Sequence, residues 1–167
     1  MLDFDPIAEA RRHWEEHGWA DAAPSMAAVT SIMRVHQLLI AEADRVLRPH
    51  GLTFSRYEVL MLLSFSRSGS LPLGKIGARL QVHAASVTNA IDRLEAQGLV
   101  RRVPHPTDGR TTLAELTARG RRVAQAATDD MNELFVALDL PTELFDVLRG
   151  VRAAAGDFTR VPNRGRT

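Results

Sequence analysis

The chain has 167 residues, of which 45% are hydrophobic and 25% are charged. These proportions are typical of a globular protein and exclude a disordered or collagen-like chain. The lack of cysteine excludes disulfides, thiolate metal ligands and thiol redox chemistry. No apolar run approaches the ~20 residues of a membrane span, and the N-terminus is acidic rather than a signal peptide, so we expect a cytoplasmic protein without a membrane partner.

The net charge is only +1, but the basic residues are concentrated in the middle of the chain. Residues 51–122 carry 11 Lys and Arg against 5 Asp and Glu, whereas residues 1–50 carry 5 against 8. A local basic excess is typical of a surface that binds nucleic acid, although an ordinary solvated face has the same composition.

Residues 1–20 predict a short amphipathic helix that has Pro6 near its start and ends near Gly18. The stretch HWEEH fits the H-x-x-E-H pattern of some zinc peptidases through three residues, His13, Glu16 and His17. Nothing else in the chain supplies a third ligand in the expected helical context. We therefore favour a surface pair on a docking helix that Trp14 or Trp19 anchors, and expect no metal site.

A second helix is predicted from Met26 to about Pro49, with Ser25 as its N-cap. Its apolar residues form a broad stripe: Val29, Ile32, Met33, Leu39, Ala43, Val46 and Leu47. A helix of ~24 residues is ~36 Å long and extends beyond the core of so small a module. It therefore needs another surface to cover it.

A helix over Arg56–Ser66, a short edge strand at Leu71–Leu73 and a helix over Gly74–Leu80 are predicted next. The following helix, from about His83 to Gln97, has its apolar residues on one side: Val87, Ala90, Ile91 and Leu94. The other side carries small and hydrogen-bonding residues suited to base edges and phosphates: Ala85, Ser86, Thr88, Asn89 and Arg93. For each of them, simple solvent exposure is the alternative.

Two strands follow, Leu99–Val103 and Thr111–Leu116, joined by an exposed turn at Pro104–Arg110. Gly98 is expected to end the preceding helix in a left-handed conformation, and Thr117 to cap the next one. The order helix, turn, helix, hairpin predicts a winged helix-turn-helix, in a mainly α fold with a small β-hairpin wing.

The stretch Ser86–Gly120 resembles the MarR family of bacterial transcriptional regulators, named after multiple antibiotic resistance. The matching pieces are DRLE at Asp92–Glu95, GLV with arginines at Gly98–Arg102, Asp108 and Arg110 in the turn, and LT-x-x-G at Leu116–Gly120. The resemblance implies double-stranded DNA binding, with Arg110 in the minor groove. Asp108 is expected to brace the wing by pairing with an arginine such as Arg102, or to be an ordinary turn aspartate.

Two further helices are predicted, Arg121–Leu138 and one that begins at Pro141, and both need a partner surface. The resemblance implies a homodimer in which residues 21–50 and 121–157 form a shared arm. Residues 1–20 are then an extra helix, residues 51–120 the DNA-binding lobe and residues 158–167 a flexible tail. Such a dimer would bind a pseudo-palindromic operator with half-sites ~10 bp apart.

The resemblance also implies a small effector, often an anionic phenolic compound, in a cleft between the arm and the DNA-binding lobe. The residues on the helices that would line this cleft are Met33, Arg34, His36, Tyr57, Met61 and Phe65. Arg34 or His36 could pair with a carboxylate of the effector, although ordinary core or surface placement is the alternative.

No nucleophile, phosphate-binding or dinucleotide motif is present, so we expect neither a cofactor nor catalysis. A repressor relieved by a small molecule is the preferred interpretation. The alternatives are a winged-helix module that binds protein rather than DNA, and a small metallohydrolase built on HWEEH.

Overall fold

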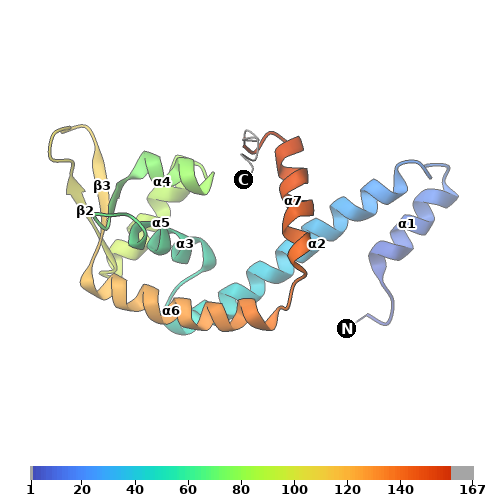
Figure 1. The fold of residues 1–167 in the computed structure, drawn as a ribbon, viewed down its shortest axis with the longest axis horizontal. Helices are drawn as coiled ribbons and strands as arrows, with labels where there is room; N and C mark the ends of the chain where they lie inside the picture. The colour runs from blue at the N-terminus through green and yellow to red at the C-terminus, as the bar shows by residue number, and fades with distance from the viewer. Residues whose placement is uncertain (1, 159–167) are drawn as a thin grey trace, which may run out of the picture. The chain divides into compact units, whose positions relative to one another are not determined.

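The structure is a computed structural model that describes residues 2–158 (Figure 1). The chain divides into two compact units, Met1–Asn132 and Glu133–Thr167. All but the first residue of the predicted tail lies outside the described residues.

Two helices begin the first unit and pack against each other: α1 (Pro6–Glu16) and α2 (Ala23–Leu47). The side chain of Asp5 caps α1, because its Oδ1 accepts hydrogen bonds from the backbone N–H of Ile7 (2.9 Å) and Ala8 (3.2 Å). The prediction of Ser25 as the cap of α2 is wrong: the helix begins at Ala23, three residues before the predicted start at Met26, since Pro24 fits within a first helical turn.

A short 3-10 turn, η1 (Arg48–His50), ends α2, and the DNA-binding lobe expected from the sequence follows. Its elements are α3 (Phe54–Ser64), β1 (Ser70–Pro72), α4 (Leu73–Leu80), α5 (Ala84–Ala96), β2 (Val100–Pro104) and β3 (Thr112–Leu116). The strands form an antiparallel sheet in the order β1-β3-β2. The structure thus confirms a mainly helical fold with a small wing formed by β2 and β3 (Figure 1).

The core of the lobe lies where α3, α4 and α5 pack on the sheet. The apolar side of α5 faces inward as predicted, with Val87, Ile91 and Leu94 at most 2% exposed. They join buried residues of the neighbouring elements: Leu60, Leu63, Ile76, Val100, Ala114 and Leu116. This burial is the main stabilising contribution and fixes which side of α5 faces solvent.

Helix α6 (Ala118–Ala137) begins directly after β3. As predicted, Thr117 caps it: its Oγ1 accepts a hydrogen bond from the N–H of Gly120 (2.9 Å) and donates to the carbonyl of Gly98 (2.8 Å). Gly98 has φ +68°, the left-handed conformation expected at the end of α5. One threonine therefore joins the end of α5 to the start of α6.

Helix α7 (Thr142–Ala154) lies in the second unit and contains no buried residue. Its apolar side chains remain exposed, among them Phe145, Val147 and Val151. Among residues 2–158, every helix is too short or too polar to cross a lipid bilayer.

The first turn of α6 approaches β2 so closely that only glycine fits at position 120. A Cβ added to Gly120 would lie 2.0 Å from the carbonyl oxygen of Leu99 and 2.9 Å from Cδ1 of Leu116. We expect Gly120→Ala to lower the free energy of unfolding by about 2 kcal/mol, measured by urea denaturation. Gly74→Ala is the control, since nothing lies within 4 Å of its added Cβ; equal losses for both would contradict the packing described.

Candidate nucleic-acid interface

The solvent-facing side of α5 presents the residues that the sequence singled out. Ala85, Ser86, Thr88, Asn89 and Arg93 are all exposed, because the buried side of the helix is occupied by Val87, Ile91 and Leu94. The turn between α4 and α5 is tight: a Cβ on Gly77 would lie 3.2 Å from the Val82 carbonyl oxygen and 3.3 Å from Cγ2 of Val87. This close packing sets the position of α5 relative to α4.

A cluster of charges joins α5 to the wing. The guanidinium of Arg102, on β2, donates to Asp92 (2.5 Å) and to Glu95, both on α5. The backbone N–H of Arg102 also donates to Glu95 (2.8 Å). The backbone and side-chain hydrogen bonds from Arg102 hold the pKa of Glu95 below its ordinary value. Helix and wing are therefore linked by charge-assisted hydrogen bonds.

The predicted pairing of Asp108 with Arg102 is wrong. The carboxylate of Asp108 instead accepts hydrogen bonds from the hydroxyl of Thr111 (2.6 Å) and the backbone N–H of Arg110 (3.1 Å). Both hydrogen bonds lower the pKa of Asp108, and the bond from the Thr111 hydroxyl has the larger effect. Asp108 is thus a turn aspartate, as the alternative interpretation had it, while Arg102 is occupied by the carboxylates of α5.

The arginines of this region divide into paired and unpaired ones. Arg102 is neutralised by α5, and Arg101 pairs with Glu115 across the hairpin at 2.7 Å. Within residues 2–158, Arg93 and Arg110 make no ion pair, and both are exposed. The unpaired guanidinium groups are therefore the ones available to an external anion.

Two further groups near the wing were not found from the sequence. Lys75, in the first turns of α4, and His105, on the wing, border an open cleft together with Asp108 and Arg110. Lys75 is also exposed and without an ion pair among the described residues. The sequence did not indicate that Lys75 lies near the wing, because only the fold brings the start of α4 next to it.

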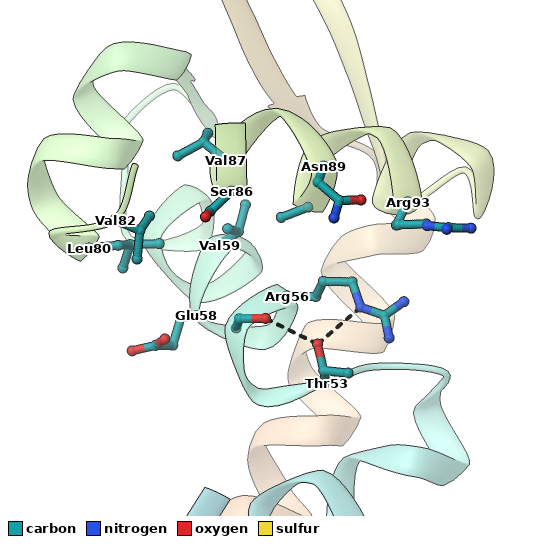
Figure 2. A pocket seen from close by; sticks show the side chains of 12 residues that line it. Thr53, Arg56, Glu58, Val59, Leu80, Val82, Ser86, Val87, Asn89 and Arg93 are labelled. Atoms are coloured by element: carbon teal, nitrogen blue, oxygen red, sulfur yellow. Dashed lines mark hydrogen bonds between the residues drawn. The ribbon is translucent and has the colours of Figure 1, made fainter. Parts of the chain in front are cut away.

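A pocket of about 550 Å³ lies between α3 and α5 (Figure 2). Ser86, Asn89 and Arg93 line it from α5, while Arg56 and the segment Thr53–Ser55 approach from the start of α3. Arg56 is held by a hydrogen bond from its Nε to Oγ1 of Thr53 (3.1 Å). The polar face of α5 therefore continues onto α3, and Arg56 is a candidate contact that the sequence analysis missed.

The residues expected to line an effector cleft separate into two groups. Tyr57, Met61 and Phe65 line one apolar pocket of about 320 Å³, together with Glu58, Leu62 and Leu80. Tyr57 is fixed there by a hydrogen bond between its hydroxyl and Oγ1 of Thr128 (3.1 Å). The other three, on α2, are exposed and do not line this pocket: Met33, Arg34 and His36.

The HWEEH stretch lies on α1 and at its end. His13 pairs with Glu16 at 3.2 Å, and Nδ1 of His17 lies 2.7 Å from the carbonyl oxygen of His13. Within the described part of the chain, no group of three or more His, Cys, Asp or Glu residues could hold a metal ion. Trp14 and Trp19 pack against each other, with ring centroids 5.1 Å apart.

Comparison with known proteins agrees with this geometry. The sequence profile of the MarR family matches residues 52–112. The HTH-type transcriptional regulator MhqR of Bacillus subtilis is 32% identical over 89 residues, which are 53% of this chain and 60% of that protein. The HTH-type transcriptional repressor Rv2887 of Mycobacterium tuberculosis is 33% identical over 96 residues, 58% of this chain and 68% of the repressor.

Solved structures show the same likeness over a longer stretch. Sco5413, a MarR family transcriptional regulator from Streptomyces coelicolor, is 53% identical with a TM-score of 0.73, over 82% of this chain and 99% of that chain. Sco3205 from the same organism, solved in complex with DNA, is 26% identical with a TM-score of 0.70, over 83% and 89% of the two chains. With its wing, its helix-turn-helix and these relatives, the chain belongs to the MarR family of DNA-binding transcriptional regulators.

Proposed function

We propose that the protein is a homodimeric repressor that binds a pseudo-palindromic DNA operator and is released from it by a small effector molecule. The observation that carries the proposal is the exposed polar face of α5, joined through Arg102 to a wing with an unpaired arginine at its tip. The DNA complex of Sco3205, a protein of similar fold and 26% identity, supports the same use of the lobe.

Within this proposal, the two parts of the lobe contact DNA differently. The side chains of Ser86, Thr88 and Asn89 are short and polar, so they suit base edges or nearby phosphates in the major groove, where Ala85 allows close approach. Arg93 and Arg110 carry the free positive charge, Arg93 toward phosphate or guanine and Arg110 toward the minor groove. Asp108 shapes the turn that presents Arg110.

Dimerisation is supported by apolar surface that the single chain leaves uncovered. Helix α2 has 25 residues, but only Ala23, Ala43 and Leu47 are buried. Its exposed apolar residues are Val29, Ile32, Met33, Val35 and Leu38, and α7 adds Phe145, Val147 and Val151. A second copy would cover such surfaces symmetrically and present two α5 helices, which favours half-sites about one DNA turn, ~10 bp, apart.

Release by an effector is supported by the apolar pocket at Tyr57, Met61 and Phe65. Leu80 at the end of α4 and Glu58 on α3 each line both this pocket and the pocket beside α5. A ligand that prefers one spacing of α3, α4 and α5 would change the population of the DNA-binding arrangement.

Selection from a randomised pool of DNA duplexes should recover an inverted repeat. Titration of the protein with that site then measures how much Arg93 and Arg110 contribute to DNA affinity. We expect Arg110→Ala and Arg93→Ala each to weaken binding about tenfold, because each removes one unpaired positive charge. The plot of log affinity against log salt concentration should flatten by about one unit or less for each substitution.

Arg11→Ala is the matched control, since it removes the same charge from α1, where Arg11 is paired with Glu15 at 3.0 Å. Its affinity and salt dependence should equal those of the unmodified protein. Unchanged affinity in both Arg93→Ala and Arg110→Ala would show that the lobe does not hold DNA in the proposed way.

The link between α5 and the wing gives a separate prediction. Arg102→Gln leaves Asp92 and Glu95 without their cation, so we expect a loss of about 1–3 kcal/mol in the free energy of unfolding. Operator affinity should also fall, even under conditions where the variant is fully folded. Arg101→Gln, which breaks only an exposed pair with Glu115, should cost under about 1 kcal/mol. If urea denaturation gives the same midpoint for both variants, Arg102 does not join helix and wing.

A further inference from the structure

Glu58 is a partly buried carboxylate that no other side chain among residues 2–158 compensates. It lies on α3 and lines the apolar pocket of Tyr57, Met61, Leu62, Phe65 and Leu80. Within residues 2–158 it makes neither an ion pair nor a hydrogen bond. Carboxylates that are withdrawn from water are normally paired, because an isolated charge loses its hydration.

The two arginines that line the neighbouring pocket, between α3 and α5, do not pair with Glu58. Figure 2 shows Arg56 and Arg93 at one end of the pocket between α3 and α5, and the carboxylate of Glu58 at the other. Arg56 is instead bonded to Thr53. Burial accordingly raises the pKa of Glu58 above its ordinary value, and no cation in the described part of the chain offsets this effect.

The other walls of the apolar pocket suit an organic cation. Tyr57 and Phe65 are aromatic, and aromatic faces attract ammonium groups through the ring quadrupole. Met61 adds a polarisable thioether. Phe65 is 78% exposed, so its ring is accessible to an entering ligand. The pocket is open to solvent and has a volume of about 320 Å³, so it suits a ligand of one ring that stays partly exposed.

We propose that this pocket binds a small aromatic amine, with its ammonium group paired to Glu58 and its ring against Tyr57, Met61 and Phe65. The proposal rests on the effector part of the proposed function and names its ligand class. It replaces the anionic aromatic compound that the family resemblance implied. A ligand carboxylate would face Glu58, while Arg34 and His36 are absent from the lining.

The test uses three ligands that share a phenylethyl group and differ in the polar group at its end: phenethylamine, 2-phenylethanol and 3-phenylpropionate. Calorimetric titration of the full-length protein at pH 7 should show saturable binding of the amine, at least tenfold tighter than that of the propionate. Glu58→Gln keeps the shape of the side chain and removes its charge, so it should weaken amine binding at least tenfold and leave 2-phenylethanol nearly unchanged. Phe65→Ala, at an exposed position, should weaken the amine a few-fold without affecting the fold.

Propionate binding as tight as that of the amine, no saturable amine binding, or equal amine affinity in Glu58→Gln would overturn the proposal. Operator titration in the presence of the amine separates this result from the proposed function. If the amine binds and DNA affinity does not change, the ligand class stands and the effector role fails. If the amine does not bind while operator binding is normal, the pocket proposal alone fails.

The pH dependence of the free energy of unfolding tests independently whether Glu58 is unpaired. The pKa of Glu58 is raised in the folded protein, so as pH rises above about 4.3 its carboxyl group loses its proton more readily in the unfolded chain than in the folded one. The free energy of unfolding therefore falls above that pH. Without ligand, Glu58→Gln should therefore be more stable than the unmodified protein at pH 7, with the difference shrinking toward pH 4. Lower stability of the variant at pH 7 would mean that Glu58 has a partner, which would contradict the proposal.

Discussion

The contact of Arg102 with Asp92 and Glu95 is the constraint on which the DNA-reading unit depends. These two carboxylates lie on the solvent side of α5, and the arginine that meets them lies on β2, so a helix and a hairpin are held as one body. The core fixes the rotation of α5 through Ile91 and Leu94 and anchors the base of the hairpin through Val100, and the ion pairs of Arg102 add a link further along the wing. Simultaneous contact of a helix and a wing with two grooves requires that their separation be fixed.

The same contact explains why the positive charges of the lobe are not equivalent. Arg101 and Arg102 pair with carboxylates of the same chain, whereas Arg93 and Arg110 form no ion pair with the other described residues and can meet an external anion. The carboxylates differ in the same way: Asp92 and Glu95 are paired, whereas Glu58 has no ion pair with any residue from 2 to 158. An unpaired acid in an apolar pocket lowers stability, and groups of this kind are more common at binding sites than elsewhere. The proposed DNA contacts and the proposed amine site therefore follow from one observation, the distribution of unpaired charge.

Much of the lobe could be predicted from the sequence because its determinants are local. The spacing of Val87, Ile91 and Leu94 identified the buried side of α5, and Gly98 and Thr117 marked helix ends through their own backbone preferences. The pairing of Arg102 was not predictable, since two acids on a neighbouring helix compete with Asp108 and only the fold decides between them. Arg56 and Lys75 were missed because each is a single charged residue whose significance comes from elements distant in sequence.

We propose that two chains, joined through α2 and α7, place two α5 helices on one duplex. The most direct test is the mass of the protein by sedimentation equilibrium, free and with a duplex that carries the selected inverted repeat. We expect two chains in the free protein and two chains per duplex, with much weaker binding when one half-site is moved by five base pairs, about half a DNA turn. A monomer in solution, or equal binding to the shifted duplex, would contradict it.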